Sequence, residues 1–282
     1  MSGEDLAGNT FSIASTTDGS AVNIDRTSPT VTAVSSNDTN ATKIIGNTVN
    51  VKVTFSEAVT VTGTPQLTLA TGQNNGAGTA VDYSSGSGSA DLIFQYTVAA
   101  GDTSTDLDYV AADSLALNGG TIKDSHGNDA VLTLAEPGAA NSLGANKYFI
   151  IDGIVPTVTG VSSDDDHTAT KKIGDTVDVK VTFDQAVTVT DTPTLTLATG
   201  GAGTAVNYTS GTGTANLIFR YTVAENDASA DLDYVATTSL SGTIKSAAGN
   251  AADLTLPTPG NGNVGSLANA KAFVIDLSLI HI

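Results

Sequence analysis

The sequence contains no cysteine, no tryptophan and only one methionine. The absence of cysteine excludes disulfide bonds, thiolate metal sites and cysteine nucleophiles. Basic residues are few, with 11 lysines and arginines against 29 acidic residues and a formal net charge of −18. Such a surface repels phosphate groups, so we expect no nucleic acid partner. No apolar run approaches the roughly 20 residues that cross a bilayer, which predicts no membrane span.

The residues that are abundant favour β-structure. The chain has 282 residues, 40% of them apolar, which is enough for about two domains with buried cores. The apolar residues are mostly valine, isoleucine, leucine and alanine, with abundant threonine and 29 glycines. This mixture suits pleated, half-buried surfaces and predicts an all-β protein.

A long stretch of the chain occurs twice. The segment "GNTVNVKVTFSEAVTVTGTPQLTLATG" begins at Gly46, and "GDTVDVKVTFDQAVTVTDTPTLTLATG" begins at Gly174, with 21 of 27 residues identical. Further on, "GAGTAVDYSSGSGSADLIFQYTVA" from Gly76 returns as "GAGTAVNYTSGTGTANLIFRYTVA" from Gly201. A repeat of this length marks a repeated folding unit.

The repeat sets the predicted domain boundaries. Each unit opens on a Pro-Thr-Val segment and closes on a strand that ends in aspartate, which places the units at residues 27–152 and 153–276. Residues 1–25 resemble the end of such a unit, and we expect them to be the C-terminal remnant of a preceding repeat. Residues 277–282 follow neither unit, and we expect a truncation scar there.

Strands are visible inside each unit. In "VNVKVTF" the apolar residues Val49, Val51, Val53 and Phe55 alternate with polar ones, which predicts a strand with one buried face that ends near Ser56-Glu57. Glycine-rich turns separate several such short runs. The pattern predicts tandem immunoglobulin-like (Greek-key) β-sandwich domains in an elongated arrangement, without helices.

The sequence offers little support for catalysis. The three histidines, His126, His167 and His281, do not recur between the units, and no zinc-protease or serine-nucleophile motif occurs. We interpret all three as solvated loop residues and predict that the chain is not an enzyme.

Calcium is the stronger chemical hypothesis, because it binds carboxylate, amide and backbone oxygens. In a sandwich of this type a loop between the last main strands lies near the point where the chain enters the unit. We therefore expect a calcium site at the first junction, formed by Asp25, Glu57, Asp124 and Asn128.

A second junction site is predicted from the equivalent residues Asp152, Asp184 and Asn250, and residues 164–166 are additional candidate ligands. It is weaker, because Ser246 occupies the position of Asp124.

A rival set of aspartates recurs in both units, with these members: Asp102, Asp106, Asp108, Asp227, Asp231 and Asp233. Because Asp106 and Asp108 alternate with a leucine, we interpret them as the exposed face of a strand. Tyr109 and Tyr234 resemble the corner tyrosine of immunoglobulin-like folds, whose hydroxyl bonds to nearby backbone.

The segments "VKVTFSEAVTVTGTPQLTL", "YTVAAGDTSTDLDYVA", "GGTIKDSHGN" and "IIDGIVPTVTGV" resemble the tandem immunoglobulin-like repeats of very large bacterial surface proteins, of the type associated with cell-surface swimming proteins and giant adhesins. The resemblance implies an exported, extracellular extender of many repeats, stiffened by calcium at its junctions. It also implies that any glycan or protein ligand is bound elsewhere in the full-length protein. Ser246, and Gln185 in place of Glu57, depart from the pattern at the second junction.

Three functions follow from these patterns. The leading one is a structural and adhesive surface repeat, whose partners are the neighbouring repeats of the same chain. The second is a β-sandwich module that binds a glycan or a protein through its loops. The third is a spacer in a secreted polysaccharide-degrading enzyme.

Overall fold

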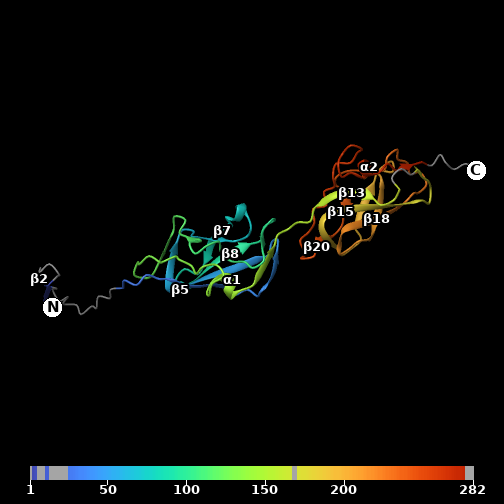
Figure 1. Ribbon diagram of the computed structural model, residues 1–282. Coiled ribbons are helices and arrows are strands. Elements are labelled where there is room, and N and C mark those ends of the chain that lie inside the picture. Colours follow the sequence, from blue (N-terminus) through green and yellow to red (C-terminus); the bar gives the residue numbers. More distant parts are fainter. Residues whose placement is uncertain (1, 5–9, 13–24, 167–169, 277–282) are drawn as a thin grey trace, which may run out of the picture.

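The protein is nearly all β and folds as a sandwich-type structure (Figure 1). The computed structural model describes residues 2–4, 10–12, 25–166 and 170–276. The predicted tail at 277–282, most of the predicted remnant at 1–25, and the histidines His167 and His281 lie outside these residues. Before the first core, β1 (Ser2–Glu4) pairs antiparallel with β2 (Thr10–Ser12).

The first half of the chain forms a seven-stranded sheet in the order β10-β6-β7-β8-β5-β11, with β3 beside β5. Its strands are β3 (Val31–Ser36), β5 (Thr48–Thr62), β6 (Gln66–Leu69), β7 (Thr79–Ser85), β8 (Ser89–Thr97), β10 (Leu115–Ala116) and β11 (Thr121–Lys123). A smaller sheet places β12 (Phe149–Asp152) between β4 (Ala41–Ile44), to which it is parallel, and β9 (Thr103–Ser104), to which it is antiparallel.

The second half repeats this topology, with the sheet order β13-β15-β18-β17-β16-β19 and β20 beside β15. Its strands are β13 (Val158–Ser163), β15 (Thr176–Val189), β16 (Thr194–Leu197), β17 (Thr204–Ser210), β18 (Thr214–Thr222), β19 (Leu240–Ser241) and β20 (Ile244–Ser246). The short strand β14 (Thr170–Lys171) pairs parallel with β21 (Val274–Ile275).

Each half has its own buried core, which the two-residue alternation of the sequence produces. Val49, Val51, Val53 and Phe55 all face the first core, as the sequence predicts. The first cluster extends from Val34 to Ile151 and the second from Val161 to Ile275. The predicted domain boundaries enclose these clusters, and residues 153–156 join them without regular structure.

The predicted end of the first long strand is wrong. Strand β5 does not stop near Phe55 but continues to Thr62. Its pairing with β8 shifts between Thr54 and Val59, which is a bulge, and the buried alternation then resumes at Val59. Glu57 therefore lies within a strand, at the bulge, and not at the end of one.

The absence of helices is also a wrong prediction, because the described part of the chain contains two single-turn α-helices. They are α1 (Leu143–Asn146) and α2 (Leu267–Ala270), and a 3-10 turn, η1 (Asn74–Gly76), occurs in a loop. Ser142 caps α1, since its hydroxyl accepts the backbone N–H of Ala145 at 3.1 Å. One turn is too short to produce a helical repeat of apolar residues in the sequence.

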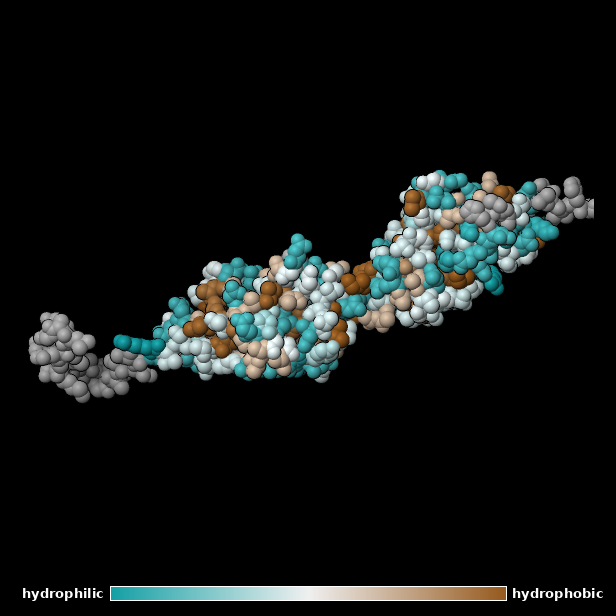
Figure 2. Space-filling model, in the orientation of Figure 1, coloured by the Kyte–Doolittle hydropathy of each residue, from teal (hydrophilic) through white to brown (hydrophobic). Residues whose placement is uncertain are grey.

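The surface is mostly polar, with scattered apolar side chains (Figure 2). On the face shown, the most hydrophobic colour includes the narrow connection between the two halves. Ile45, in a turn of the first half, is 37% exposed, and Ile154, in the connection itself, is 42% exposed. Among the described residues no helix has the length and apolar character needed to cross a membrane.

Candidate functional site

The loop after β11 holds a buried aspartate in place. Asp124 is 4% exposed, and its Oδ1 accepts the backbone N–H groups of His126 at 2.8 Å and Asn128 at 2.9 Å. Its Oδ2 accepts the side-chain amide of Asn128 at 2.6 Å. Burial by itself raises the pKa of Asp124, but these hydrogen bonds outweigh it and the pKa lies below its ordinary value. The carboxylate is therefore ionised at neutral pH.

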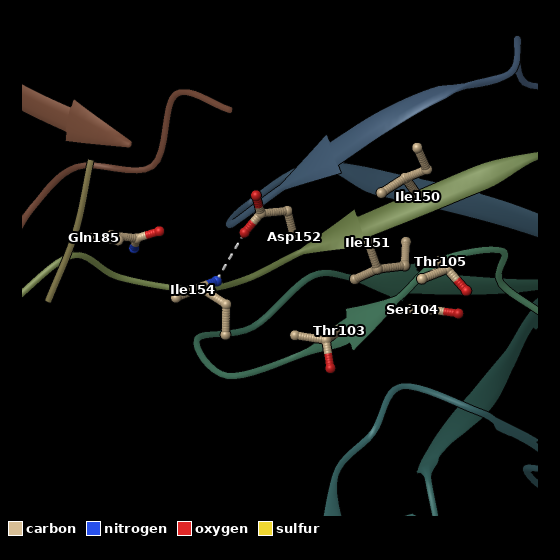
Figure 3. A pocket seen from close by; sticks show the side chains of 8 residues that line it. All are labelled: Thr103, Ser104, Thr105, Ile150, Ile151, Asp152, Ile154 and Gln185. Carbon is tan, nitrogen blue, oxygen red and sulfur yellow. Dashed lines mark hydrogen bonds between the residues drawn. The ribbon is translucent and has the colours of Figure 1, made fainter. Parts of the chain in front are cut away.

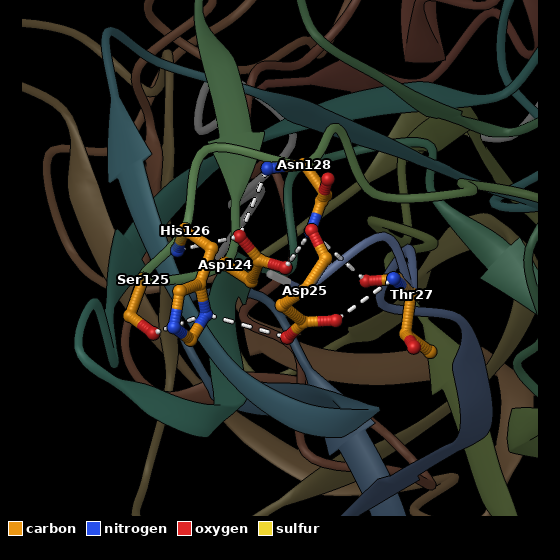
Figure 4. A network of polar contacts seen from close by, with 6 residues as sticks. All are labelled: Asp25, Thr27, Asp124, Ser125, His126 and Asn128. Carbon is orange, nitrogen blue, oxygen red and sulfur yellow. Dashed lines mark hydrogen bonds and ion pairs between the residues drawn. The ribbon is translucent and has the colours of Figure 1, made fainter. Parts of the chain in front are cut away.

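This loop meets the segment that precedes the first core (Figure 4). The amide nitrogen of Asn128 donates to the backbone oxygens of Asp25 and Thr27, each at 3.3 Å. The carboxylate of Asp25 accepts the backbone N–H of Thr27 at 2.9 Å and lies 3.3 Å from Nδ1 of His126. Ligand atoms of Asp25, Asp124 and His126 lie within 4.8 Å of one another.

Three of the four residues predicted for the first junction thus lie together: Asp25, Asp124 and Asn128. Glu57 is not a member of the cluster of close ligand atoms. His126 is an exposed loop residue, as the sequence predicted, but its place in the cluster was not predicted, although it lies only two positions after Asp124. The signal was that spacing within a glycine-containing loop, and it is a weak one.

The chemistry of the donors indicates which ions the cluster suits. The oxygen atoms of Asp25, Asp124 and Asn128 are the hard ligands that calcium takes. The imidazole of His126 is a ligand for zinc-type ions and not for calcium. The residues therefore fit a divalent cation, and calcium would use their oxygen atoms alone.

The predicted second junction is only partly assembled. Asn250 donates its side-chain amide to the backbone oxygen of Asp152 at 2.8 Å and to the carboxylate of Asp152 at 3.2 Å. Asp184 instead accepts the backbone N–H of Thr157 at 3.0 Å and the hydroxyl of Thr157 at 2.7 Å. Asp184 therefore fixes the start of the second half, and within the part of the chain that the structure describes no hydrogen bond joins it to Asp152.

An open groove of about 520 Å³ lies beside this junction (Figure 3). Its lining is Thr103, Ser104, Thr105, Ile150, Ile151, Asp152, Ile154 and Gln185. The Nε2 atom of Gln185 is buried and has no hydrogen-bond partner among the described residues. Ligand pockets are typically rich in aromatic side chains, and this lining includes none.

The rival aspartates have structural roles that the sequence did not reveal. Asp108 was expected on an exposed strand face, but it is 9% exposed, and its counterpart Asp233 is 6% exposed. Asp108 accepts the backbone N–H groups of Tyr109 and Gly138, each at 2.9 Å. Asp233 accepts those of Tyr234 at 2.9 Å and Gly260 at 2.7 Å. A buried carboxylate that accepts two backbone N–H groups holds two chain segments together.

The two predicted corner tyrosines make the expected type of bond. The hydroxyl of Tyr109 donates to the backbone oxygen of Ala135 at 2.6 Å, and that of Tyr234 donates to Pro257 at 2.6 Å. Burial raises the pKa of Tyr109 to about 12, with Asp108 adding to the effect. The hydroxyl therefore remains a proton donor at neutral pH.

Comparison with known proteins adds no family. No protein-family model matches the chain, and no curated protein matches it.

Proposed function

We propose that the chain is a non-catalytic structural and adhesive extender, made of immunoglobulin-like repeats of a large bacterial surface or secreted protein. The observation that carries this proposal is the equivalence of the two halves. The pairs Val51 with Phe94 and Val179 with Phe219 occupy the same register of the same two strands. A fold built twice around equivalent cores multiplies length, which is what a repeat protein gains from duplication.

The buried polar groups support the same proposal. Asp102, Asp108 and their counterparts Asp227 and Asp233 are occupied by hydrogen bonds to hydroxyl or backbone donors of their own half. These carboxylates stabilise loops, and their bonds recur in both halves. A reaction that both halves carried out would need the same side chains in both. His126 does not meet this condition, because Ala248 occupies its position in the second half.

The connection between the halves fits an extender with limited bending. Residues 153–156 are a short segment that ends in proline, and proline restricts the backbone of such linkers. The neighbouring repeats are thus each other's partners in the elongated arrangement that we propose. An extracellular or cell-surface location belongs to the same proposal.

Calcium at the first junction is the cofactor that we propose. The ionised Asp124, together with Asp25 and the side-chain oxygen of Asn128, would supply its ligands. A cation bound there would offset the mutual repulsion of the two carboxylates and tie the preceding segment to the first core.

Single-molecule force spectroscopy tests the extender proposal. The chain is held at its two ends and pulled at constant speed. We expect two unfolding events of similar force, each lengthening the chain by roughly 400 Å, because an unfolded residue spans at most about 3.6 Å. Extension without resolved force peaks would contradict the proposal that the folded repeats carry tension. The alternative function, a module that binds a glycan through its loops, predicts instead that adding a surface glycan shifts the NMR signals of loop residues.

A further inference from the structure

The side chain of Asn250 links the two halves of the chain. Its carbonyl oxygen accepts the backbone N–H of Ile45 at 3.0 Å. Its amide nitrogen donates to the backbone oxygen of Asp152 at 2.8 Å and to the carboxylate of Asp152 at 3.2 Å. Ile45 and Asp152 belong to the first half, whereas Asn250 belongs to the second and is 2% exposed. One buried amide therefore uses its donor and its acceptor on the opposite half.

Asn250 is held in position by its own loop. Its backbone N–H donates to the hydroxyl of Ser246 at 3.1 Å, and its backbone oxygen accepts the N–H of Ser246 at 2.8 Å. Gly249, with a φ of +111°, also donates to the hydroxyl of Ser246 at 3.2 Å. A side chain fixed in this way loses little further freedom when it bonds across the junction.

The receiving surface on the first half is also preformed. The turn at residues 44–47 is closed by the N–H of Asn47, which donates to Ile44 at 2.9 Å, and Gly46 has a φ of +83°. These features are those of a type II turn with Ile45 at its second position. The side chain of Asn47 accepts the N–H of Ile44 at 3.1 Å, so the N–H of Ile45 is the one that reaches Asn250.

We propose that Asn250 is the positioning residue that fixes the orientation of the second half on the first, and that this junction needs no cation. The interaction surface consists of the Ile45 turn and Asp152, and the partner it fits is a unit that presents a Gly-Asn loop. This inference deepens the proposed function, because it assigns the stiffness of one junction to a direct amide bridge.

The first half carries the equivalent loop, Gly127-Asn128, and uses it in a similar way. Asn128 reaches the backbone oxygen of Asp25, as Asn250 reaches that of Asp152. The loops differ in charge, since Asp124 and His126 are replaced by Ser246 and Ala248 in the second half. The amide contact is therefore common to both loops, whereas the carboxylate and imidazole that suit a cation occur in the first alone.

The substitution Ile45→Pro tests the bridge from the side opposite Asn250. Proline is favoured at the second position of a type II turn, so the turn survives while the donated N–H is lost. Ile44 precedes it in a strand, a conformation that proline permits in the residue before it. The matched control is Ile173→Pro in the equivalent turn of the second half, where Asp175 donates to Lys172 at 2.9 Å. A second control, Ile45→Ala, removes most of the side chain but keeps the backbone N–H that donates to Asn250.

Nitrogen-15 relaxation of the whole chain, in the presence of a chelator, measures how the halves tumble. In the wild-type protein we expect both halves to share one rotational diffusion tensor. Ile45→Pro and Asn250→Ala should each shorten the correlation times and make those of the two halves differ. Ile173→Pro and Ile45→Ala should behave as the wild-type protein does. Melting of each variant establishes that both cores remain folded.

The double variant Ile45→Pro/Asn250→Ala should loosen the junction no more than Asn250→Ala alone, because Asn250→Ala already removes the bond to Ile45. The proposal is overturned if the wild-type halves tumble independently in chelator, or if Asn250→Ala tumbles as the wild type does. Equal effects of Ile45→Pro and Ile173→Pro would overturn it too. None of these results bears on whether the cores resist force, which is the separate test of the extender.

Discussion

The hydroxyl of Tyr96 donates to the carboxylate of Asp102 at 2.7 Å inside the first core. Both residues are 2% exposed, and Asp102 also accepts the backbone N–H of Ala99 at 2.8 Å. Burial, with the hydrogen bond and charge of Asp102, raises the pKa of Tyr96. The pair recurs as Tyr221 and Asp227 at 2.8 Å, which shows that each half encloses the same buried charge with the same donor.

We expect Tyr96→Phe to lower the free energy of unfolding of the first half by about 1–3 kcal/mol, because a buried carboxylate loses one of its donors. Denaturant unfolding with separate probes for the two halves measures this. The control is Tyr83→Phe, since the hydroxyl of Tyr83 only accepts an N–H from the exposed Ser87 at 2.8 Å. Equal losses in the two variants would contradict the role assigned to Tyr96.

Gly86 is expected to tolerate no side chain. Its φ is +111°, and a Cβ built on it would lie 2.0 Å from the backbone oxygen of Asp91. Gly86→Ala should therefore cost about 3 kcal/mol or more of unfolding free energy. Gly88 is the matched control, because its φ is +86° but no heavy atom lies within 4 Å of a built Cβ. Gly88→Ala should cost only about 1–2 kcal/mol, from backbone strain alone.

Calcium should stabilise the first half through the Asp25 and Asp124 cluster. Replacing chelator by calcium at roughly 100 times its dissociation constant should add about 2.7 kcal/mol and raise the melting temperature. The variant Asp124→Ser should remove this response and still fold, because Ser246 holds the equivalent loop through its hydroxyl. Asp113→Asn, at an exposed position, should respond as the wild type does. A calcium response that survives Asp124→Ser would place the ion elsewhere.

Asp106 should make stability depend on pH. Burial raises its pKa, a backbone hydrogen bond at Phe149 opposes this, and the charge of Asp108 adds to it. A raised carboxyl pKa means that folding favours the protonated side chain. The contribution of Asp106 to the free energy of unfolding is therefore full below its pKa in the unfolded chain, and it is lost as the pH rises through its pKa in the folded chain. Asp106→Asn, which stays neutral, should therefore raise the melting temperature by a few degrees at neutral pH and not in acid.

The control for that experiment is Asp178→Asn, for which we expect the opposite change in melting temperature at neutral pH. Arg220 donates to both carboxylate oxygens of Asp178 at 2.7 Å, which lowers the pKa of Asp178. The contribution of Asp178 to the free energy of unfolding is present above its pKa in the unfolded chain, and it is lost as the pH falls through its pKa in the folded chain. Asp178→Asn should thus lower the melting temperature at neutral pH. Melting curves from neutral to acid pH that show the same trend for both variants would refute the assignment.

Much of the first cluster could be predicted because its geometry is local. Asp124 and Asn128 are four residues apart in one loop, so their meeting depends on a single turn. The placement of Glu57 failed because Ser56, Glu57 and Ala58 interrupt the apolar alternation at the bulge, although the alternation resumes at Val59. The burial of Asp108 was missed because aspartate is usually exposed, and only two backbone N–H groups from other positions make its burial possible.

The sequence alone determined where the main strands lie, though not where the first long one ends, together with the repeat and the inward-facing residues, because these depend on alternation and on spacing along the chain. Tertiary structure decided which polar groups meet. Asn250 and Ile45 are 205 positions apart, and no local pattern connects them. Their contact exists because the end of the first core and a loop of the second core lie together, and a buried amide in that place must find both a donor and an acceptor.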